Sequence, residues 1–363
     1  MKNVIGKELT MTLFGESHGE AIGCVLDGIP SGIKIDEDYI NEKMNQRKAA
    51  GKISTGRHEA DEVRFLSGVL NGYTEGTPIA IVIQNTNVHS KDYSSLTNIA
   101  RPSHADYAAH IRYSGYEDAR GGGHFSGRLT APIVAAGSIV RFALEQKGII
   151  IGSHILNLHG IKDKSFTDLE KEINKVNHKQ FPVLDEEIGK QMKQEIENAR
   201  DRQDSVGGIL ETVISGVEAG IGEPSFSSLE SMLSEAIFSI PAVKGIEFGC
   251  GFEFANMYGS EANDAWMIQD NKVITKTNHN GGINGGIANG MPITFKTVIK
   301  PTPSISLEQD SVNYETKENV KLSISGRHDP AIIHRARAVV DAMTALVIAD
   351  AYMMTYGRKW FEK

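Results

Sequence analysis

The segment of residues 130–146, TAPIVAAGSIVRFALEQ, is apolar on nearly every face when it is read as a helix. Pro132 falls in the first turn, where a missing backbone N–H is tolerated, and Gly148 follows as a suitable end. A helix without a polar face cannot lie exposed to water. The sequence therefore predicts a buried helix, and a fold with enough surrounding structure to enclose it.

Residues 101–128, RPSHADYAAHIRYSGYEDARGGGHFSGR, concentrate four arginines and three histidines against three acidic residues. The spacing predicts a helix capped by Ser103, with Asp106 at the capping-box position and Gly115 at its end. The N-terminus of such a helix favours anions, and the glycines at 121–123 let the backbone approach a ligand closely. We expect a site for an anionic, phosphorylated small molecule; a solvated basic helix with a glycine turn is the alternative.

Composition limits the class of protein. Of the 363 residues, 40% are hydrophobic and 23% are charged, which are ordinary values for globular chains. The net charge of -8 argues against a general nucleic-acid binder. Cys24 and Cys250 form no C-x-x-C pair, so neither a disulfide framework nor a structural zinc site is indicated. The chain shows no apolar signal core and no membrane-length apolar run, so we expect a cytoplasmic protein without a membrane partner.

The rest of the chain mixes strand-like and helix-like segments. The expected strands cover residues 9–14, 21–26, 68–85, 205–217, 243–254 and 291–299. The expected helices cover residues 36–50, two surface segments within 162–202, residues 227–238, and a long stretch after Pro330. Ser17 and His18 fall in the tight turn between the first two strands. Their context, G-E-S-H-G, differs from the hydrolase pattern G-x-S-x-G and is weak evidence for a nucleophile.

Two parts of the sequence repeat one pattern. The run G-T-P-I at 76–79 opens a strand, and S-G-R at 126–128 then precedes a helix with an early proline. The run G-M-P-I at 290–293 opens another strand, and S-G-R at 325–327 again precedes such a helix. We interpret this as a diverged internal duplication, which would bring the two S-G-R segments near one pseudo-twofold axis.

Several catalytic motifs are absent from the sequence. It contains no G-x-x-x-x-G-K-[ST], no G-x-G-x-x-G and no H-E-x-x-H, which excludes P-loop kinases, Rossmann dehydrogenases and zincins. Arginine, lysine, histidine and serine residues in glycine-rich loops remain. Arginine suits phosphate and carboxylate oxygens, and histidine can donate a proton to a leaving oxygen. This combination fits elimination or transfer of phosphate without a nucleotide motif.

Seven short motifs, in this order, resemble those of the chorismate synthase family along nearly the whole chain. They are FGESHG at 14–19, RPSHADY at 101–107, GGGHFSGR at 121–128, DSVGG at 204–208, the glycine loop from 278, KPTPS at 300–304 and GRHDP at 326–330. The resemblance implies one α+β domain over residues 1–363, with buried helices between antiparallel sheets, and a homotetramer. It also implies anti-1,4-elimination of phosphate from the small molecule 5-enolpyruvylshikimate 3-phosphate, giving chorismate. Reduced FMN would be required, and NADPH is a candidate reductant.

The same resemblance assigns residues to roles. The clamp on the substrate's phosphate and carboxylates would comprise Arg47, Lys52, Arg101, Arg128 and Arg327. His104 would be the acid near the leaving phosphate, and His18 would protonate the reduced flavin. Asp329 would work with flavin N5 in removing the C6 proton, and Ser17 and Ser126 would add hydrogen bonds. Flavin contacts would come from His124, Phe125, Ser126, Ala242, Gly285, Lys300, Pro301, Thr302, Pro303, Ser304, Arg327 and Arg47.

The sequence departs from the family pattern at three places. His124-Phe125-Ser126 stands where many members have Arg-Ser-Ser, so a titratable group replaces one cation at the flavin. Lys52 stands where members have a second arginine, which removes a bidentate contact. Pro303 stands where serine is common.

Structural roles are the alternative for several of these side chains. Asp329 could instead cap the helix that Pro330 enters, and Arg112 and Arg120 could simply pair with Glu117 and Asp118. We expect no catalytic role for His58, His89, His110, His154, His159 and His178. Two other functions stay open, namely an NAD(P)H-dependent flavin reductase and a binding module for phosphate-bearing ligands.

Overall fold

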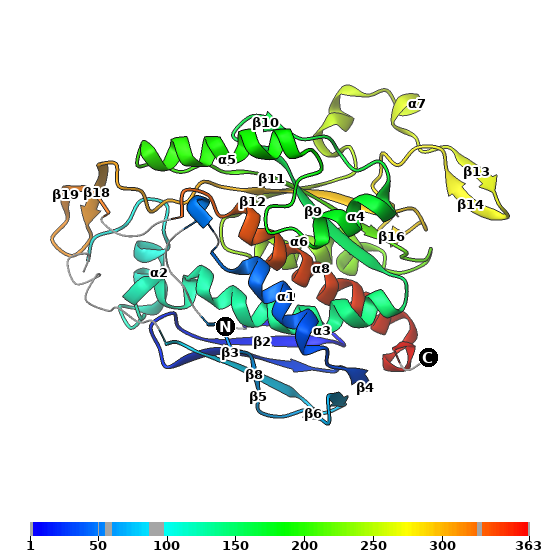
Figure 1. Cartoon of the computed structure of the whole chain (residues 1–363), viewed down its shortest axis with the longest axis horizontal. Coiled ribbons are helices and arrows are strands. Elements are labelled where there is room, and N and C mark those ends of the chain that lie inside the picture. Colours follow the sequence, from blue (N-terminus) through cyan, green and yellow to red (C-terminus); the bar gives the residue numbers. More distant parts are fainter. Residues whose placement is uncertain (1–2, 50, 55–59, 87–97, 325–328, 362–363) are drawn as a thin grey trace.

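The structure is a computed structural model, and it describes residues 3–49, 51–54, 60–86, 98–324 and 329–361. Figure 1 shows one sheet at the bottom of the view, a second sheet across the upper half, and long helices between them. The two sheets are antiparallel throughout. The expected α+β class, with helices buried between antiparallel sheets, is therefore confirmed.

The first sheet has the strand order β1-β2-β3-β8-β5. Its strands are β1 (Val4–Ile5), β2 (Thr10–Gly15), β3 (Ala21–Asp27), β8 (Ile79–Gln84) and β5 (Arg64–Phe65). Alternate residues of β8, namely Ile79, Ile81 and Ile83, are fully buried. This period of two places one face of the sheet against the helices and leaves the other toward solvent. The strands expected at 9–14 and 21–26 are confirmed.

The second sheet has the strand order β10-β9-β11-β17-β12. Its strands are β10 (Ile161–Lys162), β9 (Ile150–Leu158), β11 (Gly208–Ser215), β17 (Ile293–Ile299) and β12 (Val243–Phe248). Burial along β9 and β11 is nearly continuous rather than alternating. Helices cover both faces of these two strands, so neither face is left for polar side chains.

Small sheets and hairpins lie around these two layers. One three-stranded sheet comprises β4 (Ser31–Lys34), β7 (Tyr73–Glu75) and β6 (Val69–Leu70). Three hairpins pair β13 (Trp266–Gln269) with β14 (Lys272–Thr275), β15 (Ile283–Asn284) with β16 (Ile287–Ala288), and β18 (Gln309–Asn313) with β19 (Glu318–Leu322). The β13–β14 hairpin and the short helix α7 (Gly259–Ala262) project from the body of the molecule in Figure 1.

The central layer contains α1 (Glu37–Arg47), α3 (Thr130–Gln146), α6 (Leu229–Phe238) and α8 (Ile333–Tyr356). Helices α3 and α8 pack closely, because a Cβ at Gly137 would lie only 2.5 Å from the Cβ of Ala342. Both are long and apolar enough to cross a membrane, but 89% of the apolar window in each is buried inside the protein. They are the core helices of this fold, and the predicted burial of residues 130–146 is confirmed.

Amphipathic helices lie on the outer side of the second sheet. They are α4 (Leu169–Asn177) and α5 (Glu186–Asp201), and their N-caps are Asp168 and Asp185. Each cap carboxylate accepts a hydrogen bond from a backbone N–H of the first turn, which satisfies groups that the helix itself cannot. The two surface helices expected in the charged segment 162–202 are confirmed.

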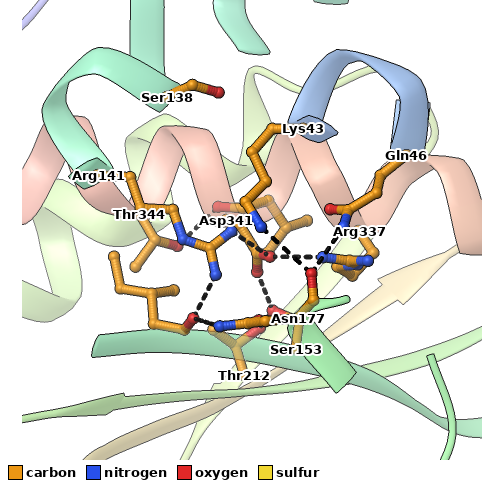
Figure 2. A network of polar contacts seen from close by, with 12 residues as sticks. Lys43, Gln46, Ser138, Arg141, Ser153, Asn177, Thr212, Arg337, Asp341 and Thr344 are labelled. Carbon is orange, nitrogen blue, oxygen red and sulfur yellow. Dashed lines mark hydrogen bonds and ion pairs between the residues drawn. The ribbon is translucent and has the colours of Figure 1, made fainter. Parts of the chain in front are cut away.

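A buried polar network joins the core helices to the second sheet (Figure 2). Asp341 of α8 accepts hydrogen bonds from Arg141 Nη1 at 3.0 Å, from Arg337 Nη1 at 3.3 Å and from Ser153 Oγ at 2.5 Å. Buried ions are costly unless their partners are well placed. The network therefore favours a single relative arrangement of α3, α8 and β9.

Two predicted helix caps are wrong. Helix α2 (Asp106–Tyr113) has Ala105 rather than Ser103 at its N-cap position, and no side chain caps it. The carboxylate of Asp106 pairs with Arg101. Helix α8 begins at Ile333 rather than next to Asp329, whose carboxylate pairs with Arg335. Strand β12 also ends earlier than expected, at Phe248. The S-G-R segment at 325–327 lies outside the described residues, so the duplication and the single domain over 1–363 stay predictions.

Candidate active site

The turn that carries Ser17 and His18 packs against the triple-glycine segment. Ser17 Oγ lies 3.1 Å from His18 Nδ1 and donates to the carbonyl oxygen of Gly121 at 3.1 Å. The backbone N–H of Ser17 donates to the carbonyl of Gly123 at 3.1 Å. A Cβ at Gly121 would lie 2.0 Å from His18 Cε1, so only glycine fits beside this buried ring. Two motifs about a hundred residues apart thus form one structure.

His124 lies beside the same turn. Its Nδ1 is 2.9 Å from the carbonyl oxygen of Gly15. A carbonyl can only accept, so Nδ1 is the donor in this contact. The next side chain, Phe125, is 45% exposed and meets the ring of Tyr113 edge-on. Ser126 Oγ accepts from the backbone N–H of Arg128 at 3.2 Å, which caps the short helix η4 (Gly127–Leu129).

Arg47 and Arg128 share one buried carboxylate, that of Asp61. Arg47 Nη2 lies 2.6 Å from Asp61 Oδ2, and Arg128 Nη1 pairs with the other oxygen. All three side chains are at most 7% exposed. Burial alone would raise the pKa of Asp61, but the two guanidiniums hold it below its ordinary value. Burial, with the nearby Arg335 and Arg128, lowers the pKa of Arg47 despite the attraction of Asp61.

The loop before α2, which carries Arg101 and His104, contacts the 300–304 loop. Arg101 makes two 2.7 Å contacts with the carboxylate of Asp106 through Nε and Nη2. His104 Nε2 lies 2.8 Å from Ser304 Oγ. Lys300 donates through Nζ to the carbonyl of Ser103 at 2.9 Å. The RPSHADY and KPTPS motifs therefore meet, although about two hundred residues separate them in sequence.

A cleft of about 250 Å³ lies where these two loops meet. Its lining includes Ser103, Ser205, Lys300, Thr302 and Gln309. In the described part of the chain, the buried Thr302 Oγ1 and Gln309 Nε2 have no hydrogen-bond partner. Unpaired buried polar atoms are costly, and both belong to residues that line this cleft.

Asp329 is connected to the arginine pair through Arg335. Arg335 Nη1 pairs with Asp329 Oδ2, and Arg335 Nε donates to the carbonyl oxygen of Arg47 at 2.8 Å. Among these ionised groups, Arg47, Arg128 and Arg335 face Asp61 and Asp329. In the part of the chain that the structure describes, this is three cations against two anions, a surplus positive charge that favours an anionic ligand.

Comparison with known proteins identifies the family. A family model described as chorismate synthase matches residues 9–353. The chorismate synthase of Pyrococcus abyssi is 46% identical over 98% of both chains, and that of Methanosarcina mazei is 43% identical over 98% of this chain and 97% of the relative. A crystal structure of chorismate synthase matches with a TM-score of 0.76 at 29% identity, over 97% of this chain and 94% of that one.

The chain belongs to the chorismate synthase family. It is accordingly a lyase that forms chorismate in the shikimate pathway of aromatic amino acid biosynthesis, acting on a small molecule. Family membership agrees with the geometry, because the elements that meet at the arginine cluster carry the motifs on which the resemblance rested.

Most of the expected site residues are brought together, but not all. Ala242 joins the 300–304 loop, because its carbonyl accepts from the backbone N–H of Lys300 at 2.9 Å. Gly285 instead lies beside the start of α6, where Gly286 contacts Ser228, whereas Ala242 follows the end of that helix. The ten residues of α6 span about 15 Å. Arg327 and the side chain of Lys52 lie outside what the structure describes; Lys52 belongs to the short helix η1 (Gly51–Ile53).

Sequence reasoning missed Asp61 and Arg335. Neither belongs to a motif with a known mechanism, and an ion pair is not visible before the chain is folded. The structural roles expected for other side chains are partly confirmed. Arg120 pairs with Asp118 at 2.8 Å, but Glu117 contacts His110 rather than Arg112. His154 is a buried core histidine between Glu211 and Asp163.

Proposed function

We propose that this chain eliminates phosphate from 5-enolpyruvylshikimate 3-phosphate in an anti-1,4 manner, with reduced FMN bound and without net redox change. The observation that carries this proposal is the contact chain linking the arginine pair to Asp329 through Arg335. This contact chain supports the proposal, because the two arginines would hold substrate anions and Asp329 would take part in removing a proton. The turn of Ser17 and His18 contacts the glycine segment at Gly121, and Arg101, in the loop of His104, lies near Gly122 of the same segment.

The donor set of the 300–304 loop fits a phosphate-bearing cofactor. Lys300 lines the cleft beside the unpartnered hydroxyl of Thr302, and both groups can donate hydrogen bonds to an anion. Pro301, Pro303 and Ser304 complete the loop, and His124, Phe125 and Ser126 would add further contacts to the cofactor. Bound reduced FMN would supply electron density while the substrate C–O bond breaks and would recover it afterwards.

The clamp would bind substrate anions through Arg47, Arg101 and Arg128, with Arg327 and Lys52 completing it. Charge-assisted hydrogen bonds to phosphate and carboxylate are the strong class of hydrogen bond. The surplus positive charge would also neutralise the departing phosphate. One well-placed donor is worth roughly 10²–10³ in rate by analogy with oxyanion holes.

Three groups would move protons. His104 would protonate the leaving phosphate, and its contact with Ser304 would orient the ring. His18 would act at the flavin, held by Ser17. Asp329, held by Arg335, would take part in removing the C6 proton. General acid–base catalysis of this kind contributes typically about 10²–10⁴-fold.

Assembly and location belong to the same proposal. We expect a cytoplasmic homotetramer. Because Gly285 lies at the far end of α6 from Ala242, it would contact the flavin site of a neighbouring copy rather than that of its own chain. NADPH remains a candidate reductant of the flavin, and we expect neither nucleic acid nor membrane as a partner.

The experiment is an anaerobic assay of purified protein with 5-enolpyruvylshikimate 3-phosphate and chemically reduced FMN, with and without NADPH. The lyase should form chorismate in both cases, with no NADPH consumed per turnover. In a parallel anaerobic sample with oxidised FMN as the electron acceptor, NADPH oxidation without chorismate would indicate a flavin reductase. Ligand binding without any turnover would indicate a binding module. Either result would reject the proposed function.

A further inference from the structure

The DSVGG motif at residues 204–208 contacts two parts of the candidate site. Ser205 Oγ donates to the carbonyl oxygen of Thr302 at 2.6 Å. The next residue, Val206, donates its backbone N–H to the carbonyl of Pro330 at 2.8 Å. Thr302 belongs to the 300–304 loop, and Pro330 follows Asp329. Two adjacent residues therefore hold the proposed flavin loop and the proposed proton-removing turn.

The two glycines of the motif are required for space. A Cβ at Gly207 would lie 2.5 Å from the carbonyl oxygen of Ile299 and 2.8 Å from the backbone nitrogen of Pro301. A Cβ at Gly208 would lie 2.2 Å from the carbonyl oxygen of Asn157 in β9, and 2.8 Å from Cδ1 of Ile333, the first residue of α8. Backbone atoms cannot yield as the end of a flexible side chain can. The motif is thus in direct contact with the start of the 300–304 loop and with the start of α8.

The ends of the motif are also held. The backbone N–H of Asp204 donates to the carbonyl of Ala199 in the last turn of α5, at 2.9 Å. The carbonyl of Gly207 accepts from the backbone N–H of His159 at 3.2 Å. Ala199 lies in α5, which covers the second sheet, and His159 lies in the turn between β9 and β10 of that sheet. The motif therefore connects the 300–304 loop and the Asp329–Pro330 turn to the second sheet and α5.

We propose that residues 204–208 are a positioning segment that sets the 300–304 loop relative to the Asp329–Pro330 turn, with Ser205 as its positioning residue. The proposal rests on the proposed function, because that function assigns the flavin to the loop and proton removal to the turn. Ser205 would not touch the reacting atoms. Its hydroxyl would act through the Thr302 carbonyl, and a displacement of about 1 Å in such a segment can cost about 10²-fold in rate.

The test compares Ser205→Ala with Ser205→Thr, which retains a hydroxyl. The control is Ser67→Ala, because Ser67 Oγ also donates to a backbone carbonyl, that of Pro78 at 2.8 Å, but lies at the first sheet. Ser205→Ala should weaken FMN binding by about two- to tenfold, as expected for one hydrogen bond. Turnover at saturating FMN should fall further, by about tenfold or more. Ser205→Thr should restore both, and Ser67→Ala should change neither.

Amide hydrogen exchange of the ligand-free protein provides a readout independent of catalysis. Ser205→Ala should raise exchange at residues 302–306 and at Val206 and Ala331, while α3 stays protected. Gly207→Ala should do the same more strongly, and Gly259→Ala, at a glycine with open space around it, should not. Unchanged exchange at both segments in Ser205→Ala and Gly207→Ala would overturn the positioning role. Loss of protection across the whole chain, with activity falling only as the folded fraction falls, would also overturn it.

The two proposals fail separately. If the wild-type protein makes no chorismate, the proposed function fails, while local exchange at the two segments still decides whether the motif positions them. If the wild type is active and Ser205→Ala matches it in FMN affinity, turnover and exchange, only the positioning role is rejected.

Discussion

Replacement of Gly121 by alanine should displace the ring of His18 without unfolding the protein. The new Cβ would lie 2.0 Å from His18 Cε1 and 2.2 Å from Nδ1. Carbon atoms in ordinary contact are about 3.5 Å apart, so the ring or the glycine segment must move by more than about 1 Å. A shift of that size can cost about 10²-fold in rate. We therefore expect turnover at saturating reduced FMN to fall by about 10²-fold or more.

Gly122→Ala is the matched control. Both glycines have positive φ, 59° at Gly121 and 85° at Gly122, so both substitutions strain the backbone by roughly 1–2 kcal/mol. At Gly122, however, a Cβ would meet nothing closer than Ser126 Cβ at 3.9 Å and Arg101 Nη2 at 4.0 Å. Melting temperatures measured by scanning fluorimetry should fall similarly in the two variants, whereas turnover should fall much more in Gly121→Ala. Equal turnover losses, or full activity of Gly121→Ala, would refute a catalytic role for the His18 position.

Three further predictions follow from single side chains. Asp329→Asn should lower turnover by at least about 10²-fold. FMN binding and melting temperature should stay near wild type, because α8 begins at Ile333 and Asp329 is not its cap. Full turnover would leave Asp329 only as a partner of Arg335. Burial opposes the charged ring of His154, but Asp163 and Glu211 raise its pKa above 6.5. The stabilisation of the folded protein by His154 should therefore be complete below pH 6.5 and should decline as pH rises through the raised pKa. Urea unfolding of His154→Gln and wild type should therefore differ most at low pH, and a difference that grows with pH would contradict this. Burial lowers the pKa of His334 to about 3, and repulsion from Arg335 and Lys193 contributes to this shift. The wild-type protein should therefore lose stability as pH falls from 6.5 toward 3, and His334→Gln should lose less stability over that range.

The regular elements could be predicted because local patterns determined them. An apolar surface on all sides identified α3, and amphipathic, capped segments identified α4 and α5. The starts of α2 and α8 were not predicted correctly, because a capping pattern in the sequence does not show which partner a carboxylate takes in the fold. Arg101 occupies the carboxylate of Asp106, and Arg335 occupies that of Asp329, so neither acid behaves as its local sequence suggests.

The candidate site was predictable as a set of motifs but not as a set of contacts. The glycine run at 121–123 indicated a close approach of the backbone, and the structure identifies His18 as the group approached by Gly121. Asp61 carries no sequence signal that distinguishes it from the neighbouring Glu62, which is exposed. Only the fold brings Asp61 between two arginines. Gly285 belongs to a family motif, yet its own chain holds it about one helix length from Ala242.

The central claim is that these converging residues catalyse an elimination in which the flavin is not consumed. The most direct measurement mixes purified protein anaerobically with one equivalent of chemically reduced FMN and a large excess of 5-enolpyruvylshikimate 3-phosphate. Chorismate, released phosphate and flavin absorbance are then followed together. We predict equal amounts of chorismate and phosphate, many turnovers per flavin, and a flavin that is still reduced at the end. Formation of no more than one chorismate per flavin, with the flavin oxidised in step, would contradict the account.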